Sequence, residues 1–189
     1  MSVALEHTGA EAAQPYVDRA HTTFPTLVDE HATTSALFGF KVVPNGVLVD
    51  EGGTIRFARF GGFSIDNPED IAAVERFRDG GEPGPSPANE GRYTLGALER
   101  ELVETKLRLG RLLYSLGRRE EAVAQWRAAL HLDPDNLVIR KQIWAACSPE
   151  KFHPTIDWQW QKEQREQERG EEIAAGVCGP DGCPVPQKA

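Results

Sequence analysis

The strongest β signal in the chain lies in residues 46–60, GVLVDEGGTIRFARF. Residues 46–49 form an apolar run that is typical of a buried strand, and residues 54–60 form a second extended run. Between them, Asp50-Glu51-Gly52-Gly53 has the composition of a tight turn. The stretch therefore predicts a β-hairpin, and a mixed α/β fold for the part of the chain around it.

Elements on either side of the hairpin follow from capping and turn residues. Residues 2–5 and 24–29 predict two short extended segments, and Pro25 keeps Phe24 out of a helix. Between them, Thr8 and Glu11 have the spacing of a capping box, which predicts a helix to about residue 20. After the hairpin, Asn67 and Pro68 predict the start of a helix that ends near residue 80. Its expected apolar face comprises Ile71, Val74 and Phe77.

A change in composition divides the chain. Residues 80–91 contain seven Gly or Pro residues and no evident apolar anchor, so we interpret them as a linker after a first domain at residues 1–79. Residues 92–148 predict three helices, with Thr94 as the first cap and Gly117 as its stop. Residues 149–175 predict a charged, solvated helix, and residues 176–189 a flexible tail with two cysteines. The expected fold class is α+β followed by an all-α region.

Charge and composition exclude several functions. The net charge is −8 and no basic stripe is present, which argues against nucleic acid as a partner. No apolar run approaches the ~18 residues of a membrane-spanning helix, and residues 1–10 lack the pattern of a secretory signal. We therefore expect a cytoplasmic protein without a membrane partner. The three cysteines, Cys147, Cys178 and Cys183, are too few for a disulfide framework, and we expect Cys147 to be a buried small apolar residue.

Residues 103–136 resemble one tetratricopeptide repeat, a 34-residue pair of helices. The matching positions are Leu109, Gly110, Leu113, Ala122, Trp126, Ala129 and Pro134. Small residues at Gly110 and Ala122 suit a close crossing of two helices, and Lys106 departs from the repeat, which usually has tryptophan there. The resemblance implies either a helical hairpin that packs against its neighbours or a groove that binds a protein or peptide partner.

Residues 24–29 (FPTLVD) and 38–55 (FGFKVVPNGVLVDEGGTI) resemble the second half of a thioredoxin-like domain. The similarity covers about residues 2–80 and is closest to the redoxin branch, which contains the AhpC/TSA peroxiredoxins and the thiol–disulfide reductases of cell redox homeostasis. It implies that Pro44, after Val43, is the cis-proline that faces the active cysteines in that family. Asn45 replaces the threonine that is common there.

The family's catalytic cysteine has no counterpart in the sequence, because no cysteine precedes Cys147. The Cys-x-x-Cys helix would lie upstream of Met1, together with the strand that separates residues 2–5 from residues 46–49 in the family's sheet. We therefore expect an incomplete thioredoxin-like sheet with open edges, which favours association into a homo-oligomer. We expect no catalytic residues, no cofactor and no family turnover in this chain.

Cys178 and Cys183 flank a Gly-Pro-Asp-Gly turn that brings two sulfur atoms to one side. They suit a disulfide or a soft-metal site, although two ligands fall short of a structural zinc centre. Three functions remain open: a thiol–disulfide or peroxide reductase relative, a non-catalytic protein-interaction module, and a thiol-based metal or redox tail.

Overall fold

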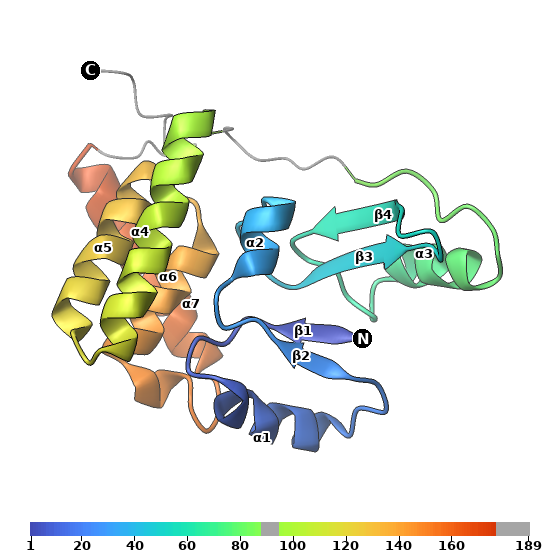
Figure 1. The fold of residues 1–189 in the computed structure, drawn as a ribbon, viewed down its shortest axis with the longest axis horizontal. Coiled ribbons are helices and arrows are strands. Elements are labelled where there is room, and N and C mark those ends of the chain that lie inside the picture. The colour runs from blue at the N-terminus through green and yellow to red at the C-terminus, as the bar shows by residue number, and fades with distance from the viewer. Residues whose placement is uncertain (88–94, 177–189) are drawn as a thin grey trace. The chain divides into compact units, whose positions relative to one another are not determined.

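The computed structural model describes residues 1–87 and 95–176 and shows a mixed α/β protein in which helices predominate (Figure 1). It divides into two compact units, one of residues 1–39 and 93–189 and the other of residues 40–92. This division differs from the boundary at residue 79 that the sequence suggests, because the first 39 residues pack with the helical part of the chain. None of the described helices is long and apolar enough to cross a membrane.

The first unit begins with a β-α-β segment. Strands β1 (Ser2–Ala4) and β2 (Thr26–Val28) pair in parallel, and helix α1 (Ala10–Ala20) connects them. The strands and the helix lie where the sequence predicts them, but the predicted capping box is wrong. The N-cap of α1 is Gly9, and the Thr8 hydroxyl instead donates to Glu6 Oε1 at 2.6 Å.

A short helix, α2 (Thr33–Phe38), follows β2 and has no counterpart in the sequence prediction. The carboxylate of Asp29 builds its first turn, because it accepts hydrogen bonds from the backbone N–H groups of Thr33 at 2.9 Å and Thr34 at 2.8 Å. These bonds hold the pKa of Asp29 below its usual value, although burial acts in the opposite direction.

The rest of the first unit is helical: α4 (Ala97–Ser115), α5 (Arg119–Leu132), α6 (Leu137–Cys147), a 3₁₀ turn η1 (Pro149–Lys151) and α7 (Trp158–Ala174). Helices α4 and α5 lie side by side and run in opposite directions (Figure 1). Helix α4 has Gly96 as its N-cap, and the predicted cap Thr94 lies outside the described residues. One apolar core joins α4, α5 and α6; its buried residues are Val103, Leu113, Ala122, Trp126, Ala129, Ile139, Ile143 and Ala146.

Helix α7 is docked rather than fully solvated, which corrects the prediction of a solvated charged helix. Arg140 of α6 is 5% exposed and donates to Glu168 and, at 2.7 Å, to Glu172 on α7. Trp144 Nε1 donates to Glu168 Oε1 at 2.6 Å, and Gln161 of α7 is buried. Two of the acidic residues of α7, Glu168 and Glu172, therefore hold this helix against α6.

The second unit contains the predicted hairpin. Strands β3 (Asn45–Val49) and β4 (Ile55–Phe60) pair antiparallel, and helix α3 (Pro68–Arg78) starts with Asn67 as its N-cap. The predicted apolar face of α3 is partly wrong. Ile71 and Val74 are 38% and 36% exposed, whereas Asp70 and Ala73 are buried.

Residues 81–87, half of the predicted linker, are fixed to the second unit. Pro83 is fully buried, and its carbonyl oxygen accepts a hydrogen bond from Arg76 Nη2 at 2.7 Å. Ser86 Oγ accepts from the backbone N–H of Ala58 on β4 at 2.9 Å. A buried proline thus supplies the apolar anchor that the composition does not reveal, and residues 88–91 lie outside the described residues.

Candidate protein-binding surface

The crossing of α4 and α5 depends on the absence of a side chain at Gly110. A Cβ atom there would lie 2.6 Å from Trp126 Cδ1 and 2.9 Å from Cε2, and closer still to Nε1. Trp126 is fully buried, and its Nε1 donates to the carbonyl oxygen of Leu107 at 3.3 Å. Ala122 and Ala129 of α5 are also fully buried. The residues that resemble a tetratricopeptide repeat therefore form a close helix crossing with an indole beside it.

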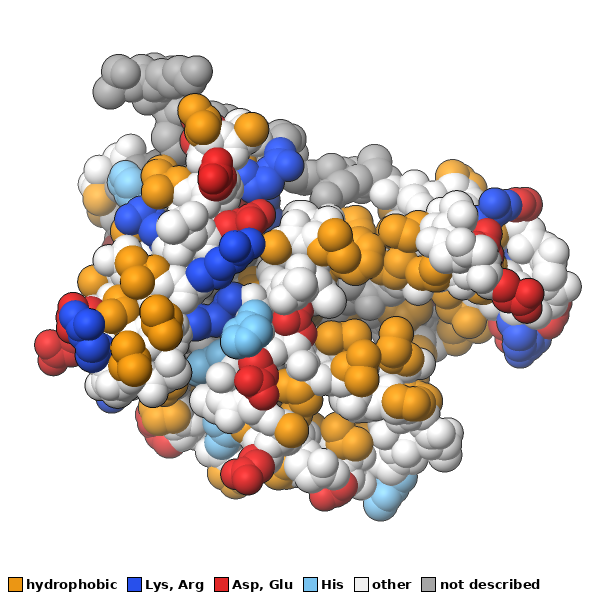
Figure 2. All heavy atoms as spheres, viewed as in Figure 1, with side chains coloured by type: hydrophobic (Ala, Val, Ile, Leu, Met, Phe, Trp, Pro, Cys, Tyr) orange, Lys and Arg blue, Asp and Glu red, His pale blue; other side chains and the backbone are white. Residues whose placement is uncertain are grey.

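Helix α4 buries one side in this crossing and exposes leucines on the other. We call these residues the leucine face; their exposed fractions are 77% for Leu98, 45% for Leu102, 40% for Leu109, 57% for Leu112 and 62% for Leu116. Figure 2 shows hydrophobic side chains gathered along α4. A row of exposed leucines on one helix is typical of an interaction surface rather than of a solvated face. The sequence predicts the leucine spacing but not which leucines stay exposed.

A second cluster in the same unit lies after strand β1 and joins segments that are distant in sequence. His7 Nδ1 lies 3.5 Å from Glu6 Oε1, and His153 Nε2 lies 3.8 Å from Glu6 Oε2. The His7 ring packs edge-on against Tyr114 of α4 and Trp126 of α5, with ring centroids 5.3 Å and 6.3 Å apart. This histidine cluster attaches the first strand to the helical pair.

The electrostatics of His7 follow from its burial. Burial lowers the pKa of His7 below its ordinary value of 6.5. The negative charge of Glu6 acts in the opposite direction but is the smaller effect, and the positive charges of Arg111 and His153 lower the pKa further. Within the described residues His7 Nε2 has no hydrogen-bond partner. Burial therefore disfavours the protonated form of His7 in the folded protein, so protonation opposes folding.

Acidification is expected to destabilise the first unit through His7. Well above pH 6.5 the imidazole of His7 is neutral in the unfolded chain as in the folded one, so the full stability is present. Below pH 6.5 the unfolded chain binds the proton more readily, and the free energy of unfolding falls by at most about 1.4 kcal/mol per pH unit. Urea unfolding between pH 7.5 and 5 checks this.

The variant His7→Phe should be less sensitive to pH than the wild type over that range. The exposed His131 of α5 offers a matched control, since His131→Gln should leave the pH dependence as it is. An identical slope for His7→Phe and the wild type would contradict the assignment.

Pro44 lies in the second unit, directly before β3. The Val43–Pro44 peptide bond is cis, the isomer expected from the sequence, and Pro44 is exposed. The Pro44 carbonyl oxygen accepts from the backbone N–H of Phe63 at 3.3 Å, and Asn45 Oδ1 accepts from that of Gly61 at 2.7 Å. Residues 40–92 contain no cysteine, so no thiol of this unit can act beside Pro44.

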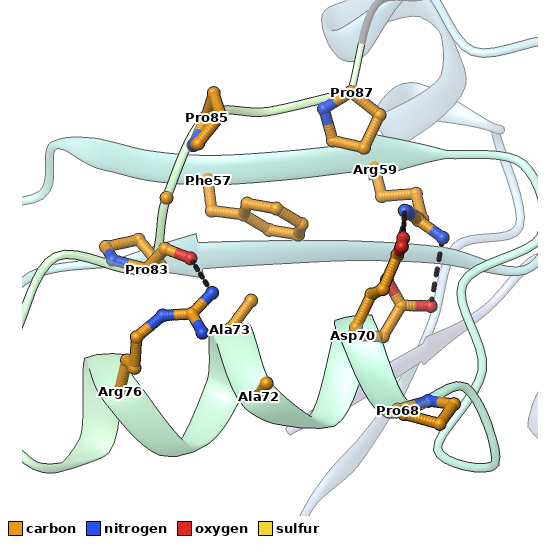
Figure 3. Close-up of a pocket in the computed structure, with 12 residues that line it drawn as sticks. Phe57, Arg59, Pro68, Asp70, Ala72, Ala73, Arg76, Pro83, Pro85 and Pro87 are labelled. Carbon is orange, nitrogen blue, oxygen red and sulfur yellow. Dashed lines mark hydrogen bonds and ion pairs between the residues drawn. The ribbon is translucent and has the colours of Figure 1, made fainter.

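The second unit also contains a groove of about 560 Å³ between β4, α3 and residues 83–87. Figure 3 shows prolines and Phe57 along it, with Arg59 directed at Asp70. Arg59 Nε lies 3.0 Å from Asp70 Oδ1, and Asp70 also accepts from the backbone N–H of Ser64 at 3.0 Å. The Arg59–Asp70 pair thus holds α3 against the hairpin, and Arg76 holds residues 83–87 to α3 through its hydrogen bond to the Pro83 carbonyl oxygen.

The cysteines do not form a described site. Cys147, expected to be buried, is exposed at the end of α6, because Ala146 occupies the buried position beside it. Cys178 and Cys183 lie outside the described residues. Within residues 1–87 and 95–176, no three His, Cys, Asp or Glu side chains gather closely enough to hold a metal ion.

Comparisons of this chain with protein-family models, with curated proteins and with solved structures found no match.

Proposed function

We propose that this chain is a protein-interaction module, related to thioredoxin-like and tetratricopeptide-repeat proteins, that works without thiol catalysis. The observation that carries the proposal is the leucine face, five leucines that are 40–77% exposed on one side of α4. Covering these water-exposed leucines with a partner stabilises the complex, by about 1.5–3 kcal/mol for each fully buried side chain. The proposal retains the cytoplasmic location expected from the sequence.

The relation to thioredoxin-like proteins rests on element order and on Pro44. The order of β1, α1 and β2, followed by β3, β4 and α3, is compatible with the second half of such a domain. Catalysis by that family needs a thiolate activated at a helix N-terminus. Pro44 belongs to a unit without cysteine, and the exposed Cys147 belongs to the other unit. Within residues 40–92, an inherited reductase or peroxidase activity therefore has no cysteine nucleophile beside Pro44.

Two measurements test the proposal. Insulin reduction and peroxide reduction by the purified chain should not exceed the buffer background. A displayed library of amphipathic helical peptides should yield binders whose affinity falls at least tenfold in Leu102→Glu and Leu112→Glu, because a carboxylate on the leucine face opposes burial.

The exposed Leu37 of α2 provides a matched control, and Leu37→Glu should leave peptide binding unchanged. Efficient turnover that is lost in the double variant Cys178→Ser, Cys183→Ser would instead establish a redox function for the cysteine tail. Peptide binding that is insensitive to Leu102→Glu would place the binding surface elsewhere.

A further inference from the structure

The leucine face has the spacing of a coiled-coil seam. From Leu98 the positions proceed in steps of four and three residues, so that alternate members take the d and a places of a heptad. The full series is Leu98, Leu102, Thr105, Leu109, Leu112 and Leu116. Thr105 is the one polar member, and it is exposed like the leucines. The seam is about 27 Å long at 1.5 Å per residue.

The flanks of this seam distinguish between possible partners. In this heptad register Glu101 takes a g position, and Lys106 takes the e position of the next heptad, five residues further on. In a parallel, in-register pair of identical helices, a g residue of one helix lies beside exactly this e residue of the other. Two copies of α4 would therefore form two Glu101–Lys106 ion pairs, one on each side of the seam.

An antiparallel pair of the same helices has the opposite electrostatics. With Leu98 opposite Leu116 of the second copy, Lys106 meets Lys106 of the second copy, and Arg108 meets its own counterpart on the other flank. Like charges in these places disfavour the antiparallel arrangement. Arg108 is paired with Glu104 of its own helix at 3.3 Å, so it is not needed for a contact between copies.

We propose that the leucine face joins two copies of this chain through a parallel, in-register pairing of α4. This inference rests on the proposed interaction function and names the partner as a second copy. The opposite side of α4 is occupied by the Gly110–Trp126 crossing, and Leu113, at the e position after Lys106, is buried there. Within the described residues, the seam is therefore the side of α4 that is left open to a second copy.

The seam is shorter than the three to four heptads of a stable coiled coil, so we expect a dimer that dissociates at about 1–100 μM. Sedimentation equilibrium of the full chain at 1 μM to 1 mM should show a monomer–dimer transition. Leu102→Glu and Leu112→Glu should each raise the dissociation constant at least tenfold, and Leu37→Glu should not. Circular dichroism verifies that each variant is folded.

Charge reversal tests the orientation. Glu101→Lys alone and Lys106→Glu alone should each weaken the dimer, because each creates two like-charge contacts. The double variant, Glu101→Lys with Lys106→Glu, should restore the affinity of the wild type. A double variant that is as weak as the single variants would overturn the parallel pairing.

Cross-linking gives an independent measurement in a background with Cys147, Cys178 and Cys183 changed to serine. In the parallel dimer Leu98→Cys places two thiols in one layer, so the variant should oxidise to a disulfide-linked dimer. In an antiparallel dimer these thiols would be about 27 Å apart, and Leu98→Cys would cross-link only to Leu116→Cys.

The outcomes separate this inference from the proposed function. A chain that stays monomeric to 1 mM but binds helical peptides through Leu102 and Leu112 overturns the dimer and retains the interaction function. A monomeric chain that binds no peptide overturns both. A dimer that is insensitive to both leucine substitutions overturns the leucine face as its interface.

Discussion

Replacing Gly110 with alanine is expected to lower the free energy of unfolding of the first unit by about 2 kcal/mol. Alanine favours a helix by about 1 kcal/mol relative to glycine, so an unobstructed position would gain stability. At Gly110 the added methyl group would lie well within 3.0 Å of the Trp126 indole, which is fully buried and hydrogen-bonded to Leu107. Relief of that overlap needs separation of α4 from α5, and overpacking of this kind costs about 1–3 kcal/mol.

Gly170 of α7 is the matched control, because a Cβ atom there meets nothing within 4 Å. Gly170→Ala should raise stability by up to about 1 kcal/mol. Urea unfolding followed by circular dichroism measures both variants. If the indole causes the loss, Gly110→Ala should cost less in a Trp126→Leu background than in the wild type. Equal effects of alanine at Gly110 and Gly170 would contradict the close crossing.

Replacing Arg140 with methionine is expected to cost about 3 kcal/mol and to detach α7. Burial alone would lower the pKa of Arg140, but its hydrogen bonds to Glu172 and Glu168 raise it above the ordinary value. Its Nη2 group also donates to the carbonyl oxygen of Pro134 at 2.9 Å. Removing the cation leaves the half-buried carboxylates of Glu168 and Glu172, which lie on the same face of α7, without their cation, a change that typically costs about 3–5 kcal/mol.

Tryptophan fluorescence reports this change, because the rings of Trp144 on α6 and Trp160 on α7 lie 5.8 Å apart. Limited proteolysis within α7 should become faster in Arg140→Met. The exposed Arg127 of α5 is the control, and Arg127→Met should change neither readout. Adding Glu168→Gln and Glu172→Gln to Arg140→Met should recover part of the lost stability. Arg140→Met with wild-type stability would show that α7 is held by other contacts.

Elements with local signals could be predicted from the sequence. The hairpin has an Asp-Glu-Gly-Gly turn between two apolar runs, and α5 and α6 are bounded by Gly117, Pro134 and Asn136, so their limits follow from neighbouring residues. Helix α2 could not be predicted in this way, because its six residues are too few for a periodic pattern. Asp29, whose carboxylate accepts from the first turn of α2, lies four residues before Thr33, and that spacing is the one signal in the sequence.

The candidate surface could be predicted only in part. The spacing of residues such as Leu102, Leu109 and Leu112 shows that they share a side of α4, but exposure depends on which side the helix turns toward α5. The glycine at Gly110 indicates that side, since a close crossing needs a residue without a side chain. The pairing of Glu6 with His153 has no local signal, because it joins opposite ends of the first unit.

The packing of residues 1–39 with residues beyond 93 has a consequence for synthesis on the ribosome. The Tyr16 hydroxyl donates to the carbonyl oxygen of Phe152, 136 residues later in the chain. At about 5–20 residues per second, this partner is translated roughly 7–27 s after Tyr16. The inserted unit of residues 40–92 has its whole sequence available much earlier. The unit of residues 40–92 can therefore fold before translation ends. Residues 1–39 can complete their packing only after the residues beyond 93 have been translated.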